Sequence, residues 1–275
     1  MKRALVSVVI VMSLFILGCQ KETNDSKSLT EKSTLNSVIK SKKLRVCTDP
    51  GYEPFEMRNK NNDIIGFDID LAREMAKAMN SNVELEIVPA AFDGIIPALL
   101  TEKCDMILAG MTISPERNIQ VNFPQSYLLI GQTILLSKNL EGVVNSYKDL
   151  DDPKYVISGR LGVTGTAVAE EMMPKAQKRV FEAENEAILE VVNGQADAFV
   201  YDFPLCASYA ADYPDKLVFL SEPFTYEPLG IAIRKGDPDF INWIDNFLNQ
   251  IKGDGRYDEL YNYWFNSNEW KQAVR

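Results

Sequence analysis

Apolar and polar residues alternate along the chain in a pattern that predicts strands and helices in turn. Three short apolar runs in the first half are typical of strands: 44–47, 83–88 and 105–109. Between the first two, Leu71, Met75 and Met79 recur every four positions, which predicts an amphipathic helix capped by Asp68. A second helix begins at Asp93. This order of elements indicates a parallel sheet with right-handed crossovers.

A second alternation follows the long β-prone run 127–136. It predicts strands over 155–163, 180–181, 198–201 and 229–233, and helices over 167–173 and 187–192. An amphipathic helix from Phe240 and a shorter helix through Trp264 end the chain. Two α/β units with two extended passages between them predict a two-lobed α/β fold with a two-segment hinge. We assign 35–127 and 228–275 to lobe 1, and 128–227 with the hinge strands to lobe 2.

The first nineteen residues follow a different pattern. Lys2 and Arg3 precede an apolar run over 4–17, which is typical of a secretory signal and too short for a membrane span. The run ends at Ile16-Leu17-Gly18-Cys19, which resembles the bacterial lipobox. We therefore expect a signal peptide over 1–18, a lipid such as palmitate on Cys19, and a flexible tether over 19–34. The alternative is a plain signal peptide with an incidental cysteine.

The charge of the chain changes the range of possible partners. The formal net charge is −10, and removal of Lys2 and Arg3 with the signal would make it −12. We expect no nucleic-acid partner, because such a chain has no basic patch that displaces counterions. The chain has no histidine, which excludes Ser-His and Cys-His catalysis and histidine-based metal sites. We expect neither a metal nor a cofactor.

Three cysteines follow Cys19: Cys47, Cys104 and Cys206. Their spacing matches no zinc or redox motif. A bridge between Cys47 and Cys104 is conceivable, because both lie in or beside strands predicted to be neighbours. We favour buried free thiols that act as small apolar side chains.

Six segments together resemble the polar amino-acid-binding proteins of bacterial ABC importers, which form family 3 of the solute-binding proteins. The resemblance covers about residues 35–266 and is carried by TDPGYEPFE at 48–56, GFDIDLA at 66–72, FDGIIPAL at 92–99, AGMTISPER at 109–117, GVTGT at 162–166 and GQADAFVYD at 194–202. It implies the type II periplasmic-binding-protein fold, with a mostly parallel sheet flanked by helices in each lobe. It also implies a free amino acid as ligand, and a permease with its ATPase as partner.

Two residues have the chemistry that a zwitterionic amino acid requires. Arg117 offers a planar fork that can bind a carboxylate through two parallel hydrogen bonds. Asp202 follows a predicted strand at the end where open α/β sheets place ligand residues, and its carboxylate suits an ammonium. Asp202 alternatively caps a helix that begins at Phe203 and Pro204.

The resemblance implies further ligand contacts. Gly110 would offer its backbone carbonyl to the ammonium, and Thr112 would offer a hydroxyl and an amide. Thr166 and the Ala167 amide would bind the carboxylate from the second lobe, and Tyr52 and Phe92 would form aromatic walls. Asp49 resembles the residue that meets the polar end of the ligand. Side-chain choice would rest on Asp49 with Glu53, Glu56, Tyr201 and Gln125. No lysine that would select glutamine stands near Val163, and an acidic mouth with no countering base favours a polar or basic ligand.

Because the expected contacts come from both lobes, ligand binding should shift an open–closed equilibrium about the hinge, and a permease would recognise the closed form. We expect a monomer held at the cell envelope, facing the periplasm or, in a Gram-positive cell, the exterior. Two alternatives use the same chain. One is an enzyme like cyclohexadienyl dehydratase, which shares the fold, and the other is a lipid-anchored sensor or adhesin.

Overall fold

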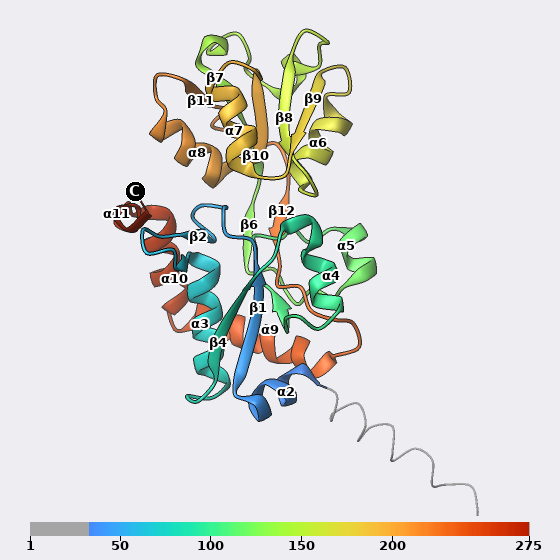
Figure 1. The fold of residues 1–275 in the computed structure, drawn as a ribbon, viewed down its shortest axis with the longest axis vertical. Coiled ribbons are helices and arrows are strands. Elements are labelled where there is room, and N and C mark those ends of the chain that lie inside the picture. The colour runs from blue at the N-terminus through green and yellow to red at the C-terminus, as the bar shows by residue number, and fades with distance from the viewer. Residues whose placement is uncertain (1–32, 275) are drawn as a thin grey trace, which may run out of the picture.

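The computed structural model describes residues 33–274 and shows two lobes stacked along the long axis of the molecule (Figure 1). Two strands pass between the lobes, β6 (Leu128–Ile130) and β12 (Glu227–Leu229), and they pair antiparallel to each other. The predicted two-lobed α/β fold is confirmed. The signal segment 1–18, Cys19 and the tether up to residue 32 lie outside the described residues.

Lobe 1 is built on a parallel sheet in the order β4 (Glu84–Pro89), β1 (Lys43–Thr48), β5 (Met106–Ile107). A small antiparallel hairpin, β2 (Met57–Arg58) with β3 (Ile64–Ile65), belongs to the same lobe. Its helices come from both ends of the chain: α2 (Thr34–Ser41), α3 (Phe67–Met79), α4 (Ile95–Leu100), α5 (Pro115–Gln120), α9 (Pro238–Gly253), α10 (Arg256–Tyr261) and α11 (Lys271–Val274). A 3-10 turn (Phe92–Gly94) precedes α4, and a π turn (Asn262–Asn266) follows α10.

Lobe 2 holds a five-stranded sheet in the order β11 (Leu217–Phe219), β7 (Gln132–Ser137), β10 (Ala198–Asp202), β8 (Val156–Arg160), β9 (Gln177–Phe181). Strand β7 runs antiparallel to both of its neighbours, whereas β10, β8 and β9 pair in parallel. The helices are α6 (Thr164–Met172), α7 (Glu184–Val192) and α8 (Phe203–Asp212), with 3-10 turns at Lys138–Leu140 and Tyr147–Leu150. The sheet is therefore mostly parallel, as the resemblance implied.

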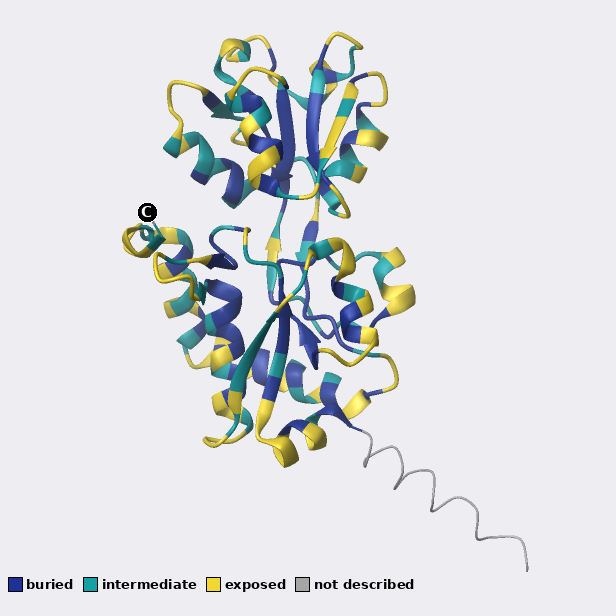
Figure 2. Ribbon diagram, in the orientation of Figure 1, coloured by how far each residue is buried: buried dark blue, intermediate teal, exposed yellow. Residues whose placement is uncertain are grey.

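The apolar stripes seen in the sequence form the core. Leu71 and Met75 on α3 are fully buried, as is Val46 on β1, which places this face of α3 in the core cluster around the first sheet. On α9 the predicted stripe is buried at Phe240, Phe247 and Ile251 among others. Figure 2 shows the inner strands and inner helix faces in dark blue and the outer faces exposed.

The structure corrects two local predictions. Helix α3 has Gly66 at its N-cap position, and no side chain caps it. The Asp68 carboxylate instead accepts hydrogen bonds from the Gly110 N–H at 2.8 Å and the Tyr127 hydroxyl at 3.0 Å, so it ties the helix to the segment after β5. The strand expected over 229–233 ends at Leu229, beyond which Ala232 and Ile233 form only isolated bridges.

The preference for free thiols at Cys47 and Cys104 was wrong, because the two residues form a disulfide. Cys47 lies opposite Ile107 in the β1–β5 register, and Cys104 stands just before β5, so the strand pairing itself brings the two sulfurs together. Cys206 is a buried free thiol.

We expect the disulfide to contribute substantially to stability, because it closes a loop across 57 positions in the unfolded chain. The chain-entropy relation gives about 4 kcal/mol, which corresponds to a fall in Tm of about 10 °C on removal. Thermal unfolding with and without a reductant measures this. The double variant Cys47→Ala/Cys104→Ala is the control, and its Tm should not respond to the reductant. A wild-type Tm that is equally unresponsive would contradict the prediction.

Candidate functional site

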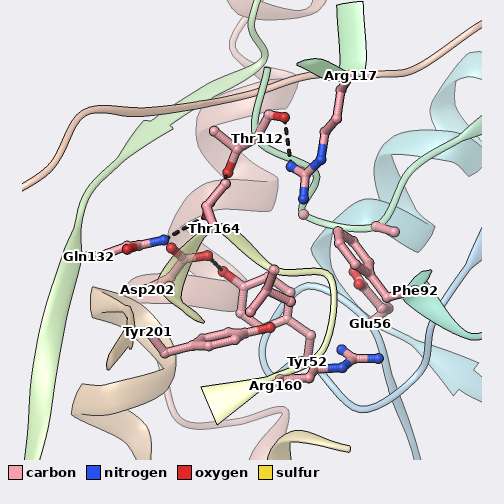
Figure 3. A pocket seen from close by; sticks show the side chains of 14 residues that line it. Tyr52, Glu56, Phe92, Thr112, Arg117, Gln132, Arg160, Thr164, Tyr201 and Asp202 are labelled. Atoms are coloured by element: carbon pink, nitrogen blue, oxygen red, sulfur yellow. Dashed lines mark hydrogen bonds between the residues drawn. The ribbon is translucent and has the colours of Figure 1, made fainter. Parts of the chain in front are cut away.

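One pocket lies between the lobes, and both lobes contribute to its wall (Figure 3). Residues that follow the strands of the two sheets line it, as expected for the carboxyl ends of strands in α/β proteins. From lobe 1 these are Tyr52, Glu56, Phe92, Ala109, Gly110, Thr112 and Arg117, and from lobe 2 Gln132, Arg160, Val163, Thr164, Gly165, Tyr201 and Asp202. The pocket thus contains six of the predicted contacts: Tyr52, Phe92, Gly110, Thr112, Arg117 and Asp202.

Arg117 lies on the short helix α5, where Ser114 caps the first turn by accepting from the Arg117 amide at 3.3 Å. Its guanidinium donates to the carbonyl oxygens of Thr112 at 2.8 Å and Gly162 at 3.1 Å, which come from different lobes. Among residues 33–274 no carboxylate forms an ion pair with it, and burial lowers the pKa of Arg117. The site therefore holds an oriented positive charge that suits an added anion.

Asp202 ends β10 and stands at the N-cap position of α8, but its side chain makes no capping hydrogen bond. One carboxylate oxygen accepts from the Tyr52 hydroxyl across the lobes, and the other is buried with no partner in the described part of the chain. Burial is the main cause that raises the pKa of Asp202 to about 7. An added ammonium would supply the missing donor and favour the ionised form.

Two polar residues complete this end of the pocket, and the sequence analysis missed both. The Gln132 amide nitrogen donates to the Thr164 hydroxyl at 2.6 Å, and the Gln132 amide oxygen is buried with no partner within residues 33–274. The hydroxyls of Thr164 and Thr112 lie 3.4 Å apart, which joins the two lobes. Gln132 was detectable as the one amide within the apolar run 127–136.

The aromatic wall is held close to the backbone. A Cβ at Gly110 would lie 2.2 Å from the Tyr52 ring, and the φ of Gly110 is +53°, so a larger residue there would displace the ring. The Phe92 ring has two guanidinium carbons over it, that of Arg117 at 5.2 Å and that of Arg160 at 5.5 Å from the ring centroid. These are cation–π distances.

Arg160 corrects the expectation of an acidic mouth without a base. It ends β8, is 5% exposed, and forms ion pairs with Asp49 of lobe 1 and Glu184 of lobe 2. The Tyr201 hydroxyl also donates to Glu184, at 2.9 Å. The pairing with two carboxylates raises the pKa of Arg160, against the effect of its burial. Arg160 lies inside the strand predicted over 155–163, so the argument used for Asp202 did not reach it, and only the structure places it at the end of β8.

Three predicted contacts lie outside the lining. The Asp49 carboxylate pairs with Arg160 and accepts a hydrogen bond from the Phe92 backbone N–H at 2.8 Å. The Thr166 hydroxyl donates to the Arg160 carbonyl at 2.6 Å, and Ala167 is exposed. Because α6 begins at Thr164, that residue and Gly165 meet the pocket instead. Of the residues expected to set side-chain choice, Glu56 and Tyr201 line the pocket, whereas the Gln125 amide donates to Asp245 and Asn249.

A family model described as bacterial extracellular solute-binding proteins, family 3, matches residues 44–267. The chain is 30% identical over 263 residues to the ABC transporter glutamine-binding protein of Bacillus subtilis (strain 168), covering 95% of each. A binding component of an ABC transporter from Wolinella succinogenes, solved in complex with lysine, is 50% identical, with a TM-score of 0.81 over 84% of this chain and 98% of that one. An ancestral amino acid-binding protein, described as a precursor of cyclohexadienyl dehydratase, is 48% identical, with a TM-score of 0.80 over 85% and 100% of the two chains.

We expect Asp202→Asn to stabilise the ligand-free protein as the pH rises. The raised pKa means that folding is favoured while Asp202 is protonated, and this stability is lost between the unfolded pKa near 4 and the folded pKa of about 7. The asparagine avoids the loss, so the variant should gain up to about 4 kcal/mol on wild type at pH 8 and little at pH 4. Denaturant unfolding at both pH values measures this.

The matched control is Asp215→Asn, because Asp215 is exposed on the same lobe. It should track wild type at both pH values. A difference between Asp202→Asn and wild type that stays constant with pH would show that Asp202 is ionised in the folded protein.

Proposed function

The chain belongs to the bacterial extracellular solute-binding proteins of family 3, and we propose that it binds a free amino acid between its lobes and delivers it to the permease of an ABC importer. One observation carries the proposal. Arg117 and Asp202 come from opposite lobes, line the same pocket, and each lacks an oppositely charged partner within residues 33–274.

A zwitterionic amino acid complements this pair. Its carboxylate would accept from the Arg117 fork and from the Thr164 end of α6, and its ammonium would donate to the unpartnered oxygens of Asp202 and Gln132. Buried charges are costly unless each is paired, so a ligand with only one of the two groups would leave the other residue uncompensated.

Closure follows from the division of these contacts between the lobes. Tyr52–Asp202, Asp49–Arg160 and the Arg117 bond to the Gly162 carbonyl already join the lobes. A ligand held by one lobe adds charged contacts to the other, so binding favours the closed arrangement. The closed shape would be the form that the permease recognises.

The ligand's side chain is proposed to be polar or basic. Carboxyl groups outnumber guanidinium groups around the pocket, since Glu56, Asp202 and the two partners of Arg160 face only Arg117 and Arg160. The relative from Wolinella succinogenes is complexed with lysine, which agrees with such a surplus. We further propose that the protein acts as a monomer and catalyses no reaction.

Calorimetric titration with the twenty amino acids should identify at least one polar or basic ligand with a Kd on the order of 1 µM or below. Arg117→Ala and Asp202→Asn should each weaken its binding by about 100-fold or more, because each leaves a ligand charge buried and unpaired. The exposed residues Arg58 and Asp215 provide controls, and Arg58→Ala and Asp215→Asn should bind as wild type does.

Near-normal affinity in Arg117→Ala or Asp202→Asn would refute the site. Deletion of the protein should abolish uptake of the ligand, whereas loss of chemotaxis or adhesion alone would favour a sensor or adhesin. Turnover of prephenate or arogenate would favour the dehydratase alternative. One observation favours testing this alternative: a related structure is described as a precursor of such an enzyme.

We propose in addition that the chain is exported and anchored at the cell envelope by a lipid on Cys19. The described residues contain no helix long and apolar enough to cross a membrane, so the proposal rests on the lipobox pattern at residues 16–19. Cells fed an alkyne analogue of palmitate should label wild type and fail to label Cys19→Ser. Equal labelling of the two would contradict the assignment.

A further inference from the structure

Glu56 is an acidic side chain in the pocket wall for which Arg117 and Asp202 provide no role. It closes the turn after Tyr52, where its amide donates to the Tyr52 carbonyl at 2.9 Å. The side chain lines the pocket, the residue is 1% exposed, and one carboxyl oxygen has no partner in the described chain. In the view of Figure 3, Glu56 lies beside Phe92, across the pocket from Asp202 and Gln132.

A second buried carboxyl group acts on Glu56. Asp68 is fully buried, and besides burial its charge is one of the causes that raise the pKa of Glu56. One Asp68 oxygen accepts from Gly110 and Tyr127, and the other has no partner among residues 33–274. Two buried carboxylates that repel each other are costly to ionise together, so a protonated form of one of them is favoured.

Within residues 33–274 the base that acts on Glu56 is already paired with other carboxylates. The charged and titratable groups that face it come from every element packed on it: Asp68 on α3, Asp49 after β1, Glu184 on α7, Arg160 on β8, and the hydroxyls of Tyr52 and Tyr127. Arg160 is the only base in this group, and its ion pairs already go to Asp49 and Glu184. Burial and the neighbouring carboxylates raise the pKa of Glu56 well above its ordinary value.

We propose that Glu56 is the counter-ion for a cationic side chain of the bound amino acid, so that the pocket selects basic over neutral ligands and releases a proton when a basic ligand binds. This inference rests on the proposed function and specifies its ligand class. The proton balance is simple. The neutral Glu56 carboxyl loses its proton to the buffer, and the ligand's ammonium or guanidinium takes the place of that proton beside the carboxylate.

The geometry of the pocket suits such a ligand. Arg117 and Asp202 hold the two charges of the amino acid backbone, and the side chain then extends toward Glu56 along the rings of Tyr52 and Phe92. Flat rings cover methylene groups without loss of rotamer freedom. The charged end of the side chain then arrives at Glu56, a pocket carboxyl that has no ion pair with a base within residues 33–274 and that the ligand's backbone ammonium leaves free.

The test is calorimetry of L-lysine and L-glutamine binding to wild type, Glu56→Gln and the control Glu171→Gln, since Glu171 is exposed. Titrations in two buffers of different ionisation enthalpy count the protons released, between about pH 5.5 and 8.5. Asp202 meets the backbone ammonium of both ligands, so the difference in proton release between lysine and glutamine isolates Glu56.

We expect lysine to release more protons than glutamine in wild type, and its affinity to rise more steeply with pH. Glu56→Gln should weaken lysine binding about 10- to 100-fold, change glutamine binding by less than about threefold, and abolish the excess proton release. Glu171→Gln should match wild type.

Three results would overturn the inference. One is equal weakening of lysine and glutamine in Glu56→Gln, which is the mark of a structural role. The second is equal proton release for the two ligands in wild type, a measurement that needs no variant to fold. The third is wild-type binding of glutamine without lysine, which leaves the proposed function standing. If neither amino acid bound to wild type, this inference would fall, and the proposed function would fall with it only if the titration with all twenty amino acids also found no ligand.

Discussion

The structure depends on two charged groups of one pocket that come from opposite lobes. Arg117 of lobe 1 donates to the carbonyl oxygens of Thr112 in its own lobe and Gly162 in the other. Asp202 of lobe 2 accepts from the Tyr52 hydroxyl of lobe 1. Neither meets an opposite charge within the described residues, and each therefore carries a desolvation cost that only an added group can offset. A solute that brings both missing charges must contact both lobes at once. Recognition and lobe closure are thus one event in this design.

The residues of this site lie at the ends of strands and in the first turns of helices. Asp202 ends β10, and Arg160 ends the neighbouring strand β8. Arg117 and Thr164 lie in the first turns of α5 and α6. The rigid sheets define where each group stands, and the loops close the pocket. The Asp68 carboxylate on α3 accepts a hydrogen bond from the backbone N–H of Gly110, which lines the pocket. Helix α3, which packs in the core of lobe 1, therefore also positions this part of the pocket.

Much of the fold and part of the site could be predicted from the sequence. The alternation of apolar runs indicated both lobes. The guanidinium chemistry of Arg117 and the position of Asp202 after a strand indicated the pocket. Partners set by tertiary geometry were missed. Asp68 looks like a helix cap in the chain but binds a residue 42 positions away. Thr164 and Thr166 share one short motif, and only the start of α6 decides which of them meets the pocket. The role of Arg160 became clear only from its ion pairs with Asp49 and Glu184, which are far from it in the sequence. The disulfide was missed in favour of free thiols, since the β1–β5 register was needed to place Cys47 beside Cys104.

The pocket's surplus of carboxyl groups follows from the same constraint as its two unpaired charges. A cavity that must be stable when empty cannot keep every carboxylate ionised, because burial without a partner is too costly. Arg160 neutralises one cluster permanently, and its two ion pairs leave it unavailable for the rest. At Glu56 and Asp68 burial is instead the main cause that raises the pKa, which favours the protonated form of these carboxyl groups. A ligand's cation can replace a proton on a carboxyl group, but it cannot replace an arginine of the protein. A cation from the ligand can therefore enter where a carboxyl group is protonated in the empty pocket. The carboxyl groups paired with Arg160 therefore form the structural part of the pocket, and the protonated carboxyl groups form the part that recognises a ligand.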